Sequence, residues 1–391
     1  MVYRIGVLLL AVLFVAGCSD ETENDDTFVA GEILLTQDLQ TLTAAEAGGL
    51  GAALGIEAAF GVEVLRIEYA TTDANGEPTM ASGALAIPVG AGPVPILSYQ
   101  HGTIVRKSDA PSVSADGERA LGNLMASVGY IVAMPDYLGL GTGPGLHPYV
   151  HSATQASATI DMLRAVRTYL GQESIETDGR ILLTGISQGA HATLAAQQVM
   201  ESQLSSEFEV AAVAALSGPY DISGAMYDIM VSEEPYDNAY YLPYVTLAYD
   251  EVYDLFESPS EYFAEPYAQT IPPLFDGQNG AGTINDAMPR VPSEALQPDL
   301  LAAVTSDENH PYRNVLREND LYDGWTPQAP MRLYHCAGDD VVPISNTALA
   351  AERLAARGAD VTFIDPIPTA GHDFLCFSLA YRDALPWIAG L

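Results

Sequence analysis

The amino-acid sequence predicts an α/β protein in which a mostly parallel sheet is covered by helices on both faces. Short apolar segments alternate with segments of helical period, first over 94–216 and again over 331–385. The apolar segments are almost continuously hydrophobic, which is typical of parallel strands buried on both sides. Hydrophobic residues make up 48% of the 391-residue chain, and this excludes wholesale disorder.

The regular elements follow this alternation in order. A β-hairpin comes first, with strands at 62–70 and 81–89 around a turn at 73–76. Further strands are predicted at 94–99, 130–134, 180–185, 210–216, 331–335 and 361–364. The predicted helices cover 115–128, 152–170, 188–201, 346–357 and 377–385.

One long interval, 220–330, breaks this rhythm. It is rich in Tyr, Pro, Asp and Glu, and ten of the 21 tyrosines lie between Tyr220 and Tyr267. We expect a mostly helical cap inserted over the sheet, with the first part of the core at 31–219 and the second at 331–391. The tyrosines could line a pocket for an acyl or aryl group, or they could simply pack inside the cap.

The N-terminus has the pattern of an export signal. Arg4 precedes an apolar run over 5–17 that is short for a stable membrane span, so residues 1–17 are predicted to be a signal peptide. Val15-Ala16-Gly17-Cys18 resembles a bacterial lipobox, which implies cleavage before Cys18 and a lipid anchor on it; an incidental cysteine is the alternative. Residues 18–30 would then form an acidic tether, and Ser19 favours the outer membrane or cell surface.

The net charge of the chain limits the classes of partner that it can bind. There are 51 acidic residues against 15 Lys and Arg, a net charge of −36, and Lys107 is the single lysine. A nucleic-acid partner is excluded because no basic face exists to neutralise phosphate. The excess of acid over lysine resembles proteins from saline habitats, and we treat this as a hypothesis.

A nucleophile is predicted at Ser187. The motif Gly185-Ile186-Ser187-Gln188-Gly189 matches Gly-x-Ser-x-Gly, which is weak evidence alone because short motifs occur by chance. Here an apolar strand precedes it and a helix rich in alanine follows. A tight strand–turn–helix presents the serine hydroxyl above the sheet, and the glycines permit the close backbone approach that this turn requires.

A serine hydroxyl needs a base and an acid, and both follow in the chain. His372 lies in a loop after the last predicted strand, and Asp339 and Asp340 follow the strand before it. We favour Asp339 over Asp340 as the acid. Asp136 is a further carboxylate, but its earlier position indicates a structural role.

The remaining histidines are less suited to act as the base. His335 falls in a predicted strand, where burial is expected, and His191 lies one turn into the helix that follows Ser187. His147 and His151 stand four residues apart, yet Pro148 and the absence of an evident third ligand argue against a metal site. No metal or other cofactor is expected.

An oxyanion hole requires two N–H groups aimed at the developing charge. The backbone N–H of Gln188, directly after the nucleophile, is one expected donor. The other is expected from the loop after the strand that ends in Tyr99-Gln100-His101. We assign Thr103, with Gly102 as the alternative.

Taken together, these segments resemble the secretory lipase group of the α/β-hydrolases, which includes fungal lipase A-type enzymes and bacterial lipoprotein relatives. The resemblance rests on Tyr99-Gln100-His101-Gly102-Thr103, Pro135-Asp136-Tyr137-Leu138-Gly139-Leu140-Gly141, His147-Pro148-Tyr149, the 185–189 motif, Gly338-Asp339-Asp340 and Gly371-His372. It implies an α/β-hydrolase fold with a cap and carboxylic-ester hydrolysis of a small-molecule or lipid ester.

Other interpretations remain open at this point. Cys336 and Cys376 flank the acid and histidine loops, and in an exported protein they could form a disulfide or remain two buried thiols. The expected activity is that of a serine esterase or lipase working through an acyl-enzyme. A serine peptidase of the same fold and a non-catalytic binding lipoprotein are the alternatives.

Overall fold

The computed structural model describes residues 28–49, 51 and 55–391. The predicted signal peptide, Cys18 and most of the tether lie outside these residues. Within the described part, no helix is both long enough and apolar enough to span a membrane.

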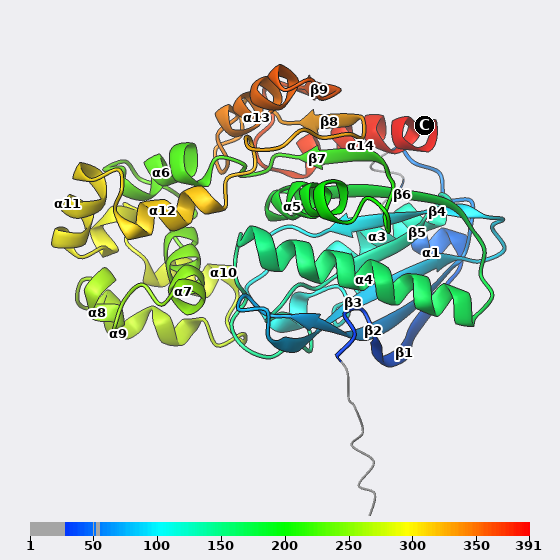
Figure 1. The fold of residues 1–391 in the computed structure, drawn as a ribbon, viewed down its shortest axis with the longest axis horizontal. Helices are drawn as coiled ribbons and strands as arrows, with labels where there is room; N and C mark the ends of the chain where they lie inside the picture. The colour runs from blue at the N-terminus through cyan, green and yellow to red at the C-terminus, as the bar shows by residue number, and fades with distance from the viewer. Residues whose placement is uncertain (1–27, 50, 52–54) are drawn as a thin grey trace, which may run out of the picture.

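A single sheet forms the centre of the fold (Figure 1), in the order β1-β2-β3-β5-β4-β6-β7-β8-β9. The pairs β1–β2, β2–β3 and β3–β5 are antiparallel, and all pairs from β5 to β9 are parallel. The strands are β1 Ile33–Leu42, β2 Val62–Thr72, β3 Pro78–Pro88, β4 Val94–Gln100, β5 Ile131–Pro135, β6 Thr177–Ile186, β7 Val210–Leu216, β8 Met331–Tyr334 and β9 Val361–Ile364. The mostly parallel sheet predicted from the apolar runs is confirmed.

Helices cover both faces of this sheet, also as predicted. One face packs against α4 (Ser152–Gln172), α5 (Gln188–Gln203) and α13 (Ser345–Ala356) through a continuous apolar cluster. The opposite face packs against α3 (Glu118–Ser127) and α14 (Phe374–Ala389), with the short α1 (Ala44–Ala47) beside them. Because the central strands are buried on both sides, they are apolar at nearly every position.

The sequence analysis missed one strand. β1 pairs only with β2 at the edge of the sheet, and Leu34 and Leu35 are both exposed there. An exposed edge strand has no buried face, so its sequence lacks the apolar run or alternation that identified the other strands. The helix predicted at 377–385 is also longer, because Asp373 caps it at Phe374.

Between β7 and β8 the chain forms the helical cap that lies over one end of the sheet (Figure 1). Its helices are α6 Tyr227–Val231, α7 Tyr241–Tyr253, α8 Pro259–Tyr262, α9 Tyr267–Thr270, α10 Ala281–Ala287, α11 Pro298–Ser306 and α12 Pro311–Glu318. Short helical turns, η2 Ile222–Met226, η3 Pro272–Leu274 and η4 Pro292–Ala295, complete it, and η1 Lys107–Asp109 follows β4 in the core. The cap has an apolar cluster of its own, rich in tyrosine.

Tyrosine hydroxyls join the cap to the core. Tyr236 donates to the carbonyl of Val341 at 2.9 Å, and Tyr249 donates to that of Val150 at 3.1 Å. Part of the tyrosine enrichment therefore serves to hold the cap against the loops of the sheet.

Candidate active site

The turn between β6 and α5 places Ser187 at the end of the sheet that the cap covers. Ser187 has φ 56° and ψ −121°, a left-handed conformation that is rare outside glycine and typical of functional turns. Its N–H donates to the carbonyl of Leu216 at 2.8 Å, which anchors the turn to β7. The strand–turn–helix expected around the Gly-x-Ser-x-Gly motif is present.

Both glycines of the motif are required by close contacts. A Cβ on Gly185 would collide with the backbone of Gly189. A Cβ on Gly189 would collide with the carbonyl of Gln100 at the end of β4. The two glycines therefore allow α5 to begin directly against the sheet, with Ser187 at the apex of the turn.

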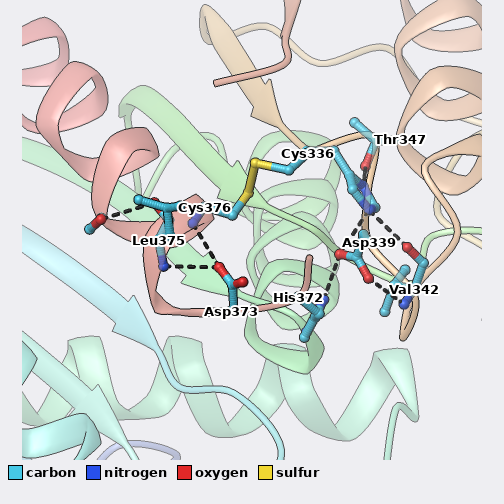
Figure 2. The surroundings of a disulfide bond; sticks show 10 residues. Cys336, Asp339, Val342, Thr347, His372, Asp373, Leu375 and Cys376 are labelled. Atoms are coloured by element: carbon cyan, nitrogen blue, oxygen red, sulfur yellow. Dashed lines mark hydrogen bonds and ion pairs between the residues drawn. A yellow bond between two sulfur atoms is a disulfide. The ribbon is translucent and has the colours of Figure 1, made fainter. Parts of the chain in front are cut away.

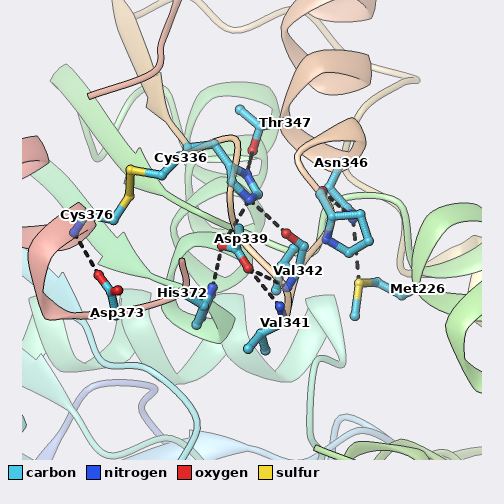
Figure 3. Close-up of polar contacts among 12 residues, drawn as sticks. Met226, Cys336, Asp339, Val341, Val342, Asn346, Thr347, His372, Asp373 and Cys376 are labelled. Carbon is cyan, nitrogen blue, oxygen red and sulfur yellow. Dashed lines mark hydrogen bonds and ion pairs between the residues drawn. A yellow bond between two sulfur atoms is a disulfide. The ribbon is translucent and has the colours of Figure 1, made fainter. Parts of the chain in front are cut away.

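His372 and Asp339 are joined at the carboxyl ends of the neighbouring strands. Nδ1 of His372 lies 2.6 Å from Oδ2 of Asp339, and the Asp339 side chain is fully buried. The N–H groups of Val341 and Val342 both donate to Oδ1 of Asp339, as Figure 3 shows. Asp340 is exposed, so of the two sequence candidates it is Asp339 that contacts the histidine.

The surroundings of Asp339 favour its charged form. Burial alone raises the pKa of the Asp339 carboxyl, but hydrogen bonds from His335 and His372 outweigh burial and hold that pKa well below its usual value. An ionised carboxylate at Nδ1 of His372 keeps the proton on Nδ1 and leaves Nε2 of the ring available as a base.

A disulfide ties the two loops that carry this pair. Cys336 and Cys376 are bonded, and both are buried beside Ala370 (Figure 2). Directly after His372, Asp373 caps α14 by accepting hydrogen bonds from the N–H groups of Leu375 and Cys376. His372 is thus held from its C-terminal side by a helix cap and a covalent bond.

The sequence names two backbone N–H groups as expected oxyanion donors, those of Gln188 and Thr103. Among the described residues, neither the N–H of Gln188 nor that of Thr103 donates to another protein atom. Gln188 is also the first residue of α5, where the helix dipole favours negative charge. The hydroxyl of Thr103 lies 3.1 Å from that of Tyr149.

The side chain of Gln188 is fixed by a neutral histidine. Nδ1 of His147 lies 2.8 Å from the carbonyl of Leu138, which can only accept, so Nδ1 carries the proton. Nε2 of His147 then accepts from the Gln188 amide at 2.6 Å. Burial lowers the pKa of His147 to about 3, so the ring stays neutral in this role.

An apolar cavity extends from Ser187 into the cap. Its walls come from the cap and from the loops after β5, β6, β7 and β8, and its volume is about 40 Å³. The lining residues are Tyr149, Val150, Ser187, Pro219, Ile222, Met226, Ile229, Met230, Tyr236, Tyr241, Leu242, Val245, Pro292 and Val342. Some cap tyrosines therefore line the cavity while others pack elsewhere in the cap.

The other residues weighed from the sequence have structural contacts. Asp136 accepts from the Ser82 hydroxyl and the Ser112 N–H. His191 contacts Gln155 and the carbonyl of Asn319 through its two ring nitrogens. His151 contacts Thr154 rather than His147, so these two histidines do not converge on one point.

Sequence reasoning missed two residues near the reacting groups. His335 contacts Asp339 from inside the protein, and Tyr149 lines the cavity with Ser187. His335 and Asp339 stand four residues apart in the sequence. This spacing brings their side chains into contact only because the chain turns at Gly338. The stretch His147-Pro148-Tyr149 carries part of the family resemblance, but the sequence alone assigns no role to Tyr149.

Comparisons with known proteins agree with this geometry. The family model of the secretory lipases matches residues 106–233. The structure of the rice cell wall degrading esterase LipA from Xanthomonas oryzae, in a ligand-bound form, is 30% identical, with a TM-score of 0.82 over 92% of this chain and 100% of that one. Candida antarctica lipase A, at 19% identity and a TM-score of 0.68 over 88% of this chain and 78% of that one, shares the fold. No curated protein sequence matches the chain.

The chain has a mostly parallel sheet with helices on both faces, and its structural neighbours are an esterase and a lipase. Its fold is therefore that of an α/β-hydrolase. Within that class, the similarity to LipA along the whole chain shows that the protein belongs to the secretory lipase family. It is therefore a carboxylic ester hydrolase, and the secretory character of the family indicates an exported protein.

Proposed function

We propose that the protein is a serine esterase in which Ser187 is the nucleophile, His372 the base and Asp339 the acid that orients it. One observation carries this proposal. Ser187 stands in a left-handed turn at the mouth of an apolar cavity, on the same sheet edge as a histidine bonded to a buried carboxylate. The chain order Ser, Asp, His is that of the α/β-hydrolases.

The first half of the reaction forms an acyl-enzyme. Oγ of Ser187 attacks the ester carbonyl carbon while Nε2 of His372 takes the hydroxyl proton. The carbonyl oxygen becomes an oxyanion, which the N–H groups of Gln188 and Thr103 would stabilise. The bond to the alkoxy oxygen then breaks, and the leaving alcohol takes the proton from His372.

The second half releases the acid. Water attacks the acyl carbon while His372 takes one of its protons. The bond to Ser187 breaks, the carboxylic acid leaves, and the proton returns from His372 to Oγ. Throughout, the ionised Asp339 stabilises the imidazolium, and no metal or other cofactor is needed.

The shape of the cavity supports esters with a slender acyl group. Its lining is mostly aliphatic and aromatic, so an acyl chain is the part of a substrate that it would bury. Its small free volume favours a short chain over the long chains of fats. The alcohol group of the substrate would then face outward.

The proposal is tested with p-nitrophenyl esters from C2 to C16 and with a fluorophosphonate, which labels activated serines. The full chain should hydrolyse short esters best and carry one label on Ser187. Ser187→Ala should lose both turnover and label. Ser217→Ala is a matched control, because Ser217 also has a positive φ but is fully buried, and it should retain both.

Other outcomes would redirect the assignment. The peptidase alternative would be favoured if the unmodified chain takes the label on Ser187, Ser187→Ala does not, and the unmodified chain hydrolyses no ester. Peptide substrates would be tested next. A folded chain that neither takes the fluorophosphonate label nor hydrolyses an ester or a peptide would favour a binding lipoprotein.

We also propose the division of the chain that the sequence indicates. Residues 1–17 would be a signal peptide, 18–30 a lipidated tether, 31–219 and 331–391 the core, and 220–330 the cap. The sequence at Cys18 and the secretory family support an exported lipoprotein at the outer membrane or cell surface. Mass spectrometry of the mature N-terminus should find a diacylglyceryl group on Cys18, and Cys18→Ala should release the protein from membranes.

A further inference from the structure

A second histidine contacts the carboxylate of Asp339. His335 follows the last residue of β8, and its N–H donates to the carbonyl of Ile364, so the edge of the sheet fixes its backbone. Its side chain is fully buried, as is that of Asp339. Nε2 of His335 lies 3.1 Å from Oδ2 of Asp339, the same oxygen that faces Nδ1 of His372 at 2.6 Å.

The hydrogen-bond partners of His335 indicate which ring nitrogen carries a hydrogen. Nε2 lies 2.9 Å from the carbonyl of Val342, which can only accept, so Nε2 carries a hydrogen. The same nitrogen lies 3.1 Å from Oδ2 of Asp339. Nδ1 lies 2.7 Å from the hydroxyl of Thr347 on α13, and a neutral ring accepts the hydroxyl proton there.

The same short segment contacts both oxygens of the carboxylate. Nε2 of His335 lies 3.1 Å from Oδ2 and 2.9 Å from the carbonyl of Val342, the residue whose N–H donates to Oδ1 at 2.8 Å. Val342 in turn lines the cavity with Ser187. Figure 3 shows Asp339 bonded to Val341, Val342 and His372, with Thr347 above it in the view.

We propose that His335, whose ring is fixed by Thr347, is a positioning residue that aims Asp339 at His372. The proposal rests on the function proposed above. A neutral donor suits this role, since a cation at Oδ2 would compete with the imidazolium that forms on His372 during the reaction. The other titratable groups near the carboxylate are Asp340, Tyr236 and Tyr241, none of which donates to it.

This role predicts a signature beyond loss of stability. With one donor fewer, the negative charge of Asp339 is less spread and holds the His372 imidazolium more tightly. The acid limb of the pH profile of kcat/KM should therefore move to higher pH, by about half a unit to one unit. A histidine that only fills space would lower stability and leave this limb in place.

The experiment measures kcat, KM and the pH profile with p-nitrophenyl butyrate, together with thermal unfolding. His335→Leu should lower kcat about 10- to 100-fold, the range for a hydrogen bond to a charged group, with little change in KM. His335→Gln, which restores an N–H donor, should recover part of kcat. Thr347→Val keeps the ring and its volume, so it carries the same test if the His335 variants do not fold.

The outcomes separate this proposal from the function beneath it. His191→Gln, at a buried histidine with no contact to Asp339, should lower stability without moving the acid limb. Unchanged kinetics in His335→Leu and Thr347→Val, or a loss of kcat with an unmoved limb, would overturn the positioning role. Wild-type turnover in Asp339→Asn would overturn the proposed triad and His335 with it, whereas an inactive Asp339→Asn beside a normal His335→Leu would overturn His335 alone.

Discussion

The hydroxyl of Tyr244, on α7 of the cap, donates a hydrogen bond to the carbonyl of Ile104, next to Thr103 in the loop after β4, at 2.8 Å. Tyr244 also stacks on Tyr149, with ring centroids 4.3 Å apart and planes within 6°. The cap is therefore bonded to the loop that holds one of the two proposed oxyanion donors. These contacts hold the cap against that loop.

The hydroxyl contacts of Tyr244 and Tyr249 should each contribute measurably to stability. Tyr244→Phe and Tyr249→Phe each leave a buried carbonyl without its donor, so each should lower the free energy of unfolding by ~1 kcal/mol. Chemical denaturation followed by tryptophan fluorescence measures this. Tyr267→Phe is the control, because its hydroxyl has no hydrogen bond in the described part of the chain, and it should match the parent. Equal stability of all three variants would contradict the idea that these hydroxyls clamp the cap.

Removing the disulfide should weaken the protein and its activity together. Cys336 and Cys376 are 40 residues apart, and cross-linking a loop of that length stabilises a fold by about 3–4 kcal/mol through the unfolded chain. The double variant Cys336→Ser/Cys376→Ser should therefore unfold at lower denaturant and lose turnover, because the Asp339 and His372 loops lose their link. Peptide mapping without reductant must find the bond in the parent. Thiol reductant should affect the parent and leave the double variant unchanged; a parent equally insensitive would count against the prediction.

Asp320 should make the protein less stable as the pH rises. Its carboxylate oxygens accept from the N–H and hydroxyl of Ser223, where the chain enters the cap. Burial raises the pKa of Asp320 to about 6, although the Ser223 bonds lower it, and Asp221 nearby raises it further. Between about pH 4 and pH 6 the folded state keeps a proton on Asp320 that the unfolded chain has released. The stabilisation from this proton is complete below about pH 4 and is lost as the pH rises through about 6.

Asp320→Asn removes this titration. The variant should be more stable than the parent by about 1–3 kcal/mol at pH 8 and nearly equal to it at pH 4.5. Urea unfolding at the two pH values gives the difference directly. A stability difference that is the same at both pH values would show that Asp320 does not titrate between them.

Salt should stabilise the chain. A net charge of −36 makes the folded state repel itself, and counter-ions screen that repulsion at the surface. The melting temperature should rise between ~0.05 and ~2 M NaCl, where the screening length falls well below the spacing of surface charges. An uncharged solute of equal osmolality serves as the control. If neither stability nor activity responds to salt, the hypothesis of a saline habitat loses its support.

Most of the fold could be predicted because its strands are buried on both faces. The run before Ser187, Ile181-Leu182-Leu183, has no polar alternation, which is typical of a parallel sheet covered on both faces. The edge strand β1 was missed for the opposite reason, since its exposed leucines carry no pattern. The cap could be located by composition but not resolved into helices, because its short elements end at turns rather than at changes of period.

The residues of the candidate site differ in how well the local sequence predicts their positions. Ser187 and Gln188 belong to one short turn whose shape depends on Gly185 and Gly189, so the motif itself predicts their geometry. The sequence favours Asp339 over Asp340 through the Asp-x-x-Val-Pro spacing, but it does not exclude Asp340, because the two carboxylates are adjacent in the same loop. Their separation into a buried and an exposed side chain follows from how the loop folds onto His372.

The sequence by itself determined the alternation of strands and helices in the core, the turn at Ser187 and the succession of Ser, Asp and His along the chain, because these follow from periodicity and short motifs. Only the tertiary structure decided that Asp339 faces His372, that His335 contacts Asp339 and that Tyr244 bonds to Ile104. Such contacts are directional hydrogen bonds of about 3 Å between residues brought together by the folded backbone. Hydrophobic pattern specifies which face of an element is buried, but it does not specify which donor meets which acceptor there.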